Sequence, residues 1–215
     1  MRPVVWGVAL FGVVARAAPA QEVSVGPHFA LGDYREVTAG LHYLGTGGGG
    51  TLWARYHRFS AEASVVQLQF HPTTGSTPAT AGFTATQVDA WLAYDVASYV
   101  SLEAGITRRT ADPAFNAQSV GAVRAGARAF YGIGPGAMLV FRVNYLAAPS
   151  FTGGGRAPVA LDLGLGLDVR LAGHVHGTAA YAFQRINRKV NPGGTGEVDA
   201  PIQETLARLG VAVGF

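Results

Sequence analysis

After Gln21, apolar residues alternate with polar or small residues along most of the chain, with a period of two. The clearest segment is 159–171, where one face is entirely aliphatic and the other carries only small or charged residues. The aliphatic face consists of Val159, Leu161, Leu163, Leu165, Leu167, Val169 and Leu171. A period of two is typical of a β-strand with one apolar face. The segment is far longer than the about 5–6 residues of a soluble strand and reaches the about 9–11 residues that cross a bilayer.

The same alternation recurs along the chain and predicts an all-β, antiparallel, up-and-down transmembrane barrel of ten strands. The predicted strands are 36–45, 49–57, 59–69, 86–96, 99–109, 119–131, 137–147, 158–171, 174–186 and 202–215. Short connections are expected at His57–Arg58, Ala97–Ser98, Ile133–Pro135 and Ala172–Gly173. Long polar connections are expected near 71–85, 110–118, 148–157 and 187–200. Short and long connections alternate, as they do in membrane barrels with short turns at one end.

The beginning of the barrel stays open, because Val23, Val25, Phe29 and Leu31 also alternate. Residues 22–35 are either a further strand or a lead-in, so barrels of eight or twelve strands remain alternatives. The nearby segment "GTGGGGT", residues 45–51, contains a G-x-G-x-x-G match. Neither a βαβ unit nor a helix is expected after it, which argues against a dinucleotide site. We interpret this segment as a hairpin loop.

The first twenty residues resemble a secretory signal peptide. Arg2 precedes an apolar run, residues 4–15, that is too short to span a bilayer as a helix. Ala18 and Ala20 then form a small-x-small cleavage pattern before Gln21. We therefore expect residues 1–20 to be removed and residues 21–215 to form one barrel domain.

The chain ends on an alternating segment with a terminal aromatic residue: Leu209, Val211, Val213 and Phe215 are its apolar set. This segment resembles the closing strand of Gram-negative outer-membrane β-barrel proteins, the small OmpA-type and porin-like barrels. The resemblance extends over residues 21–215 as a pattern only. It implies a protein of the cell outer membrane, surrounded by lipid, whose last strand is read by the outer-membrane assembly machinery.

Composition narrows the function classes. The chain is 49% hydrophobic and 13% charged, with 30 glycines and a formal net charge of +3. This low share of charge, together with the lack of any basic run, argues against nucleic-acid binding. The chain has no cysteine, which excludes disulfides and cysteine-ligated metals.

If the aliphatic face meets lipid, the opposite face lines the lumen with as many acidic as basic residues. These are Arg55, Glu62, Asp89, Asp95, Glu103, Arg109, Arg124, Arg128, Arg142, Asp162, Asp168, Arg170, Glu204 and Arg208. Buried charges persist when they are paired or kept wet. One hypothesis is therefore a network of ion pairs that fills a narrow barrel. The other is a small passive channel, with an acidic arc facing a basic arc, that admits small polar or zwitterionic solutes.

The remaining signals are weaker. Aromatic residues are expected in two interface girdles: Tyr56, Phe59, Tyr99, Tyr131 and Phe215 near the short turns, and Tyr43, Tyr145 and Phe183 near the long loops. His174 and His176 share a face but have no evident third ligand, so we expect no metal.

A catalytic role is not expected either, and no cofactor is implied. Ser60 and Ser64 lie near Glu62, but His57 and His71 flank opposite ends of that strand and cannot complete a triad with them. Two alternatives are a binding module that acts through its outer loops, and a soluble secreted β-sandwich or lipocalin-like barrel with its apolar face inward.

Overall fold

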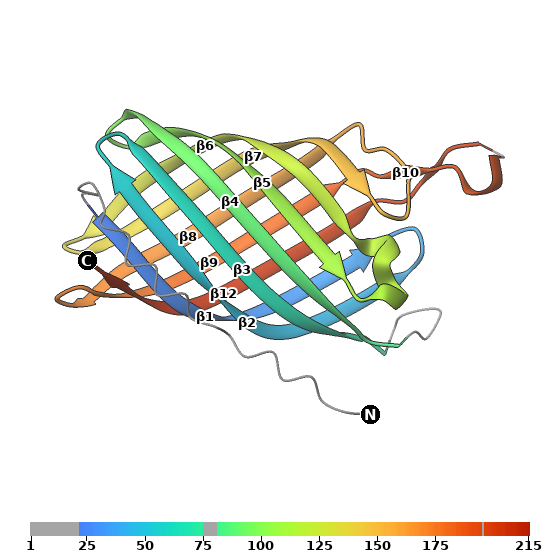
Figure 1. Cartoon of the computed structure of the whole chain (residues 1–215), viewed down its shortest axis with the longest axis horizontal. Helices are drawn as coiled ribbons and strands as arrows, with labels where there is room; N and C mark the ends of the chain where they lie inside the picture. Colours follow the sequence, from blue (N-terminus) through green and yellow to red (C-terminus); the bar gives the residue numbers. More distant parts are fainter. Residues whose placement is uncertain (1–21, 75–80, 195) are drawn as a thin grey trace.

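The computed structural model describes residues 22–74, 81–194 and 196–215. The predicted signal peptide, residues 1–20, and part of the predicted 71–85 loop lie outside these residues. Ten long strands form one closed antiparallel barrel (Figure 1), which confirms the predicted fold and strand number. Its strands are β1 Glu22–Glu36, β2 Leu41–Tyr56, β3 Phe59–Pro72, β4 Phe83–Ala97, β5 Val100–Ala111, β6 Val120–Gly134, β7 Ala137–Phe151, β8 Ala160–Ala172, β9 Val175–Ile186 and β12 Ile202–Gly214.

Smaller elements lie outside the barrel wall. A 3₁₀ segment, η1 Pro113–Gln118, joins β5 to β6. The connection from β9 to β12 carries a second sheet of β10 Lys189–Val190 and β11 Val198–Asp199, with η2 Pro192–Gly194 between them. Among the described residues, no helix is long and apolar enough to cross a membrane.

Each strand pairs with its neighbour in sequence, except that the barrel is closed by β1 pairing with β12. At this seam the Phe215 N–H donates to the Val23 carbonyl at 2.8 Å. The four predicted short turns lie at one end of the barrel, together with the C-terminus (Figure 1). The long connections lie at the other end, where a further connection, residues 37–40, is short.

The predicted boundaries of the first two strands are wrong. Residues 22–36 form a full strand, β1, and the predicted strands 36–45 and 49–57 are parts of the single strand β2. The glycine run lies inside β2 and is not a hairpin loop. A Cβ added at Gly47 or Gly49 would lie 1.8 Å from a carbonyl oxygen of β3. Glycine is thus required here because two backbones approach closely, a known use of glycine within strands.

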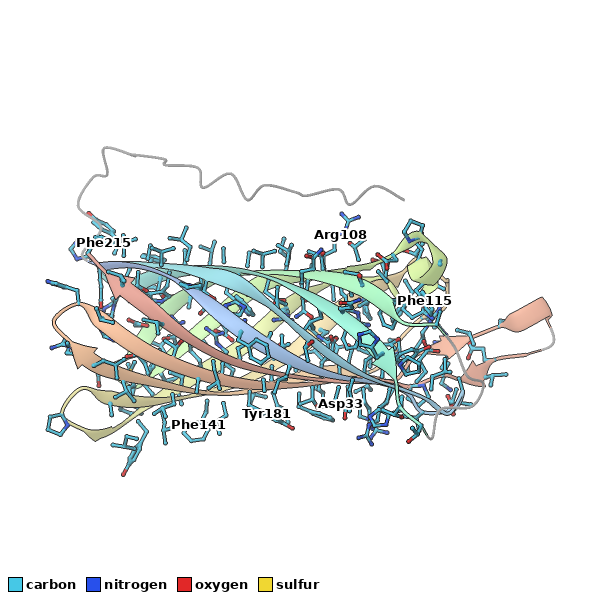
Figure 2. The ribbon with its side chains drawn as sticks, turned by 90° about the horizontal axis from the view of Figure 1, so that it is seen from below. Asp33, Arg108, Phe115, Phe141, Tyr181 and Phe215 are labelled. Carbon is cyan, nitrogen blue, oxygen red and sulfur yellow. The ribbon has the colours of Figure 1, made fainter. Side chains whose placement is uncertain are left out.

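The outer surface carries a continuous apolar belt. Its members include Phe29, Leu52, Val65, Leu92, Leu102, Ile106, Phe141, Val143, Leu163, Leu165, Tyr181, Leu209 and Val211, all exposed. Phe141 and Tyr181 point away from the barrel wall (Figure 2). This arrangement is the reverse of a lipocalin-like barrel, and the closed sheet is not a β-sandwich.

The aromatic residues predicted near the short turns, such as Tyr99 and Tyr131, are exposed. Tyr145 is also exposed, whereas Tyr43 is buried inside the barrel. The girdle prediction is therefore wrong for Tyr43, because it lies on the inward face of β2.

Candidate functional site: the barrel interior

The interior has two zones, and the zone at the long-loop end is apolar. Sixteen buried residues, contributed by all ten barrel strands, form one cluster, which we call the apolar plug. Its members are Ala30, Tyr34, Tyr43, Val66, Leu68, Phe70, Phe83, Ala85, Ala111, Val120, Ala122, Leu146, Ala160, Ile186, Ile202 and Leu206. Most of these residues lie where a strand enters or leaves a long connection.

Aromatic rings form the centre of the plug. Phe83 stacks on Phe70, and on the other side it stacks on Phe115 of η1, with ring centroids 4.9 Å apart in both pairs. Tyr43 meets Phe83 edge-on at 5.1 Å. Phe115 lies at the long-loop end of the barrel (Figure 2). Because packed interiors leave little room between side chains, the plug closes this end of the lumen.

Towards the short turns, the plug gives way to ion pairs that cross the lumen. Arg124 on β6 lies 2.9 Å from an Asp89 oxygen on β4 and 3.2 Å from an Asp162 oxygen on β8. Arg142 on β7 pairs with Glu62 on β3 and lies 3.4 Å from Glu103 on β5.

Further contacts complete this network. Arg109 pairs with Glu204, and Arg128 donates to the Ser60 hydroxyl. Arg208 donates to the Ser64 hydroxyl at 3.2 Å. Trp91 lies at the centre, with the guanidinium groups of Arg124 and Arg142 4.9 and 4.8 Å from its ring.

In the structure, the predicted lumen arginines and carboxylates alternate and pair with one another across the lumen. The predicted separation into an acidic arc and a basic arc is therefore wrong. Each of these arginines reaches groups on strands that are not its neighbours in the sheet. Buried charges arranged in this way are held by mutual pairing.

Other predicted lumen residues lie nearer the short-turn end. Arg55 pairs with Asp95 at 2.6 Å, and Asp95 also accepts from Ser101 at 2.5 Å. Asp168 contacts the His176 ring at 2.7 Å. Arg170 is exposed near the end of β8.

The structure does not bring the candidate nucleophiles and bases together. Ser60 and Ser64 contact arginines in the interior, whereas His57 lies in a short turn and His71 lies near the opposite end of β3. No group of three histidine, aspartate or glutamate side chains placed to hold a metal is found among the described residues.

The apolar plug is the feature that sequence reasoning missed, although the sequence carries a signal for it. In β3 the apolar parity changes without a turn. Ala63 and Val65 face outward, but from Val66 onward the apolar residues face inward and Gln67 and Gln69 face outward. Alternate residues of a strand face opposite sides of the sheet. When the apolar residues shift from one set of alternate positions to the other within a continuous strand, the apolar environment therefore moves from the outer face of the barrel to its interior.

Comparisons with known proteins agree with this architecture. No protein-family model matches the chain, and no curated protein matches it. Among solved structures, the outer-membrane protease OmpT from Escherichia coli is 8% identical with a TM-score of 0.55, covering 91% of this chain and 97% of OmpT.

Two other solved structures are Neisserial surface protein A, at 15% identity and a TM-score of 0.46, and Ail of Yersinia pestis, at 16% and 0.41. Each match covers 90% of this chain, with 97% and 98% of those two proteins respectively. OmpT, the match with a TM-score above 0.5, is an outer-membrane β-barrel, the class that the C-terminal pattern implied. The chain therefore has the fold of an outer-membrane β-barrel, and at these identities the likeness concerns the fold alone.

Proposed function

We propose that this protein is a closed structural barrel of the Gram-negative outer membrane that does not conduct solutes. The observation that carries the proposal is the apolar plug of sixteen buried residues across the long-loop end of the lumen. A solute would have to displace this packing and then cross a network of paired charges.

The apolar belt supports a position in the membrane. Large aliphatic and aromatic side chains are exposed around the whole barrel, at a scale far beyond the isolated exposed residues of soluble proteins. In hydrocarbon every backbone polar group has to be paired, and the closed strand order meets that requirement. Export by a cleaved signal peptide, residues 1–20, and recognition of Leu209, Val211, Val213 and Phe215 by the assembly machinery belong to the same proposal.

Barrel size also favours a filled interior. Eight-stranded barrels are filled by side chains, whereas barrels of sixteen or more strands leave an aqueous channel. Here the lumen of ten strands carries Trp91, Phe70 and Phe83 together with several arginines. Large side chains of this kind occupy the cross-section that a passive channel would need.

A permeability assay tests the proposal. Vesicles that contain the refolded protein are expected to swell in isosmotic glycine or arabinose no faster than protein-free vesicles, while vesicles with an open trimeric porin swell rapidly. Swelling above the protein-free rate, with the barrel shown to be folded by its heat-modifiable migration on a gel, would contradict a closed lumen.

A second candidate function is contact with a partner through the long-loop end. The extension formed by β10 and β11 projects beyond the long-loop end of the barrel (Figure 1). Two hydrogen bonds from the Arg156 guanidinium to the Glu197 carboxylate, at 2.6 and 2.8 Å, hold this extension. The Thr38 hydroxyl also donates a hydrogen bond to the Asp199 carbonyl at 2.7 Å. Replacing residues 189–199 by a short glycine-serine linker should abolish binding of cells to an immobilised surface partner while the barrel still folds. Unchanged binding would remove this candidate.

A further inference from the structure

A cavity of about 180 Å³ lies inside the barrel, directly beneath the apolar plug. Leu206, a member of the plug, forms part of its lining. One wall consists of small inward residues on β8 and β9, such as Gly164, Gly166 and Ala180, and the opposite side is formed by Trp91 and its arginine neighbours. The space exists because this wall contributes almost no side-chain volume where the other strands contribute large groups.

Several residues that line this cavity carry buried polar atoms without hydrogen bonds, among them Asp89 Oδ1 and the Nε atoms of Arg124, Arg142 and Arg208. Trp91 Nε1, a donor, and Glu204 Oε1, an acceptor, have no partner among the described residues, and each side chain belongs to a residue only about 5% exposed. The Trp91 ring is already in contact with Arg124 and Arg142, so its N–H edge is the part that remains free. Buried polar groups are nearly always satisfied, and leaving one unpaired is costly.

The charges around the cavity are of both signs, and most of them are already paired. Arg124 forms ion pairs with Asp89 and Asp162, and Arg142 forms an ion pair with Glu62. Arg124 and Arg142 each keep an unpartnered Nε, but their terminal nitrogens pair with carboxylates, whereas no ion pair of Arg208 is found among the described residues. Glu204 uses only Oε2 for Arg109, and Arg208 donates to the neutral Ser64 hydroxyl while its Nε is unpartnered.

Glu204 and Arg208 both lie on the inward face of β12, four positions apart. Four positions along a strand correspond to about 13 Å between Cα atoms. A negative group and a positive group therefore meet the same cavity at separate points, with the Trp91 N–H as an additional donor. This arrangement matches a ligand that carries an ammonium group and a carboxylate.

The volume limits the size of the ligand. An apolar cavity of about 150 Å³ accommodates benzene, so about 180 Å³ admits a molecule of similar size or slightly larger. Access is from the short-turn end, because the plug closes the other end and the side chains of Asp168 and His176 are 35% and 22% exposed. We propose that the cavity is a dead-end pocket that binds a small zwitterion of amino-acid size and does not pass it through the barrel.

Fluorescence of Trp91 provides a direct readout. In a Trp53→Phe chain, Trp91 is the only tryptophan after residue 20. The purified protein in detergent is titrated with L-serine as the zwitterionic probe. Two matched probes are ethanolamine, which lacks the carboxylate, and 3-hydroxypropionate, which lacks the amine. We expect a saturable emission shift with serine, and binding at least tenfold weaker for either single-charge probe, because each leaves one of the two charged groups unused.

Variants link the signal to the cavity. Ala180→Leu should abolish the response by filling the space, whereas Ala104→Leu, an equal change on the exposed outward face of β5, should leave it intact. If Ala180→Leu does not fold, Gly166→Ala serves instead, since its added Cβ would meet Val140 Cβ at an ordinary 3.5 Å and should weaken binding.

Three outcomes would overturn the proposal. The first is the absence of a saturable response to serine, which would mean that water alone occupies the cavity. The second is a serine response that the cavity-filling variant leaves unchanged. The third is ethanolamine or 3-hydroxypropionate binding as tightly as serine, which would contradict the zwitterionic class.

Discussion

Arg124 is the arginine whose removal should most strongly destabilise the barrel. Its side chain is 4% exposed, and the carboxylates of Asp89 and Asp162 that it joins are 3% and 9% exposed. In an Arg124→Met variant the two acidic groups would face each other across the lumen without a cation between them. Methionine retains much of the side-chain length, so the variant mainly tests the loss of charge.

The expected loss is set by the burial of all three groups. Removing one partner of a buried ion pair costs about 3–5 kcal/mol, because the remaining charge is left uncompensated. The contact between the guanidinium and the Trp91 ring, at 4.9 Å, adds about 0.5–2 kcal/mol. We therefore expect the free energy of unfolding to fall by at least about 3 kcal/mol.

Equilibrium unfolding of the refolded protein in urea, in lipid vesicles, measures this change. Arg108→Met is the matched control, because Arg108 points outward from β5 (Figure 2) and its loss should change stability by no more than about 0.5 kcal/mol. Adding Asp89→Asn and Asp162→Asn to the Arg124 variant should recover most of the loss. A loss below about 1 kcal/mol for Arg124→Met alone would show that water solvates these carboxylates, and would refute the paired network.

Three further predictions concern the wall, a loop and the chain end. Leu165→Arg, in the middle of β8, should cost about 2–4 kcal/mol of stability in vesicles, whereas Gly166→Arg places its charge in the lumen; equal tolerance at both positions would contradict the assignment of faces. The hydrogen bond from Arg156 lowers the pKa of Glu197, so this pairing is complete above the ordinary carboxyl pKa and is lost as pH falls through the lowered pKa. Carboxyl NMR should show this pKa rising in Arg156→Ala, and an unchanged value would exclude the pairing. Deleting Phe215 should reduce the amount of barrel in the outer membrane without impairing refolding in detergent; equal amounts in cells would argue against an assembly signal.

The strands were predictable because the alternation of apolar and polar residues is set by residues close together in the sequence. In β8 the alternation predicted 158–171, and the strand is Ala160–Ala172. The glycine run misled the prediction because glycine is a turn signal as well as the residue that permits close backbone approach. Only the proximity of β3, a long-range feature, decides between the two at Gly47 and Gly49.

The pairing of the interior charges was not predictable from sequence. Parity placed Glu62 and Arg142 on inward faces, but they lie on β3 and β7 and meet across the lumen. Arg109 and Glu204 likewise come from β5 and β12. Such contacts depend on the height of each residue along the barrel and on the curvature of the wall, which neighbouring sequence does not encode.

The apolar plug has the most direct bearing on function. Towards the long-loop end of β3, the inward positions change from polar to apolar residues, and this change indicates where the plug lies. Val66, Leu68 and Phe70 continue the inward face that begins with Ser60 and Glu62. A purely local search for lipid-facing residues assigns such segments to the wrong side.

Single-channel recording of the refolded protein in a planar bilayer tests the closed lumen most directly. A closed lumen predicts a current indistinguishable from that of the bare bilayer at all voltages that the bilayer tolerates, with the protein shown to be folded and inserted. Reproducible conductance steps that change when Arg142 or Asp162 is neutralised would contradict it, because ions would then be passing through the charged interior and the plug.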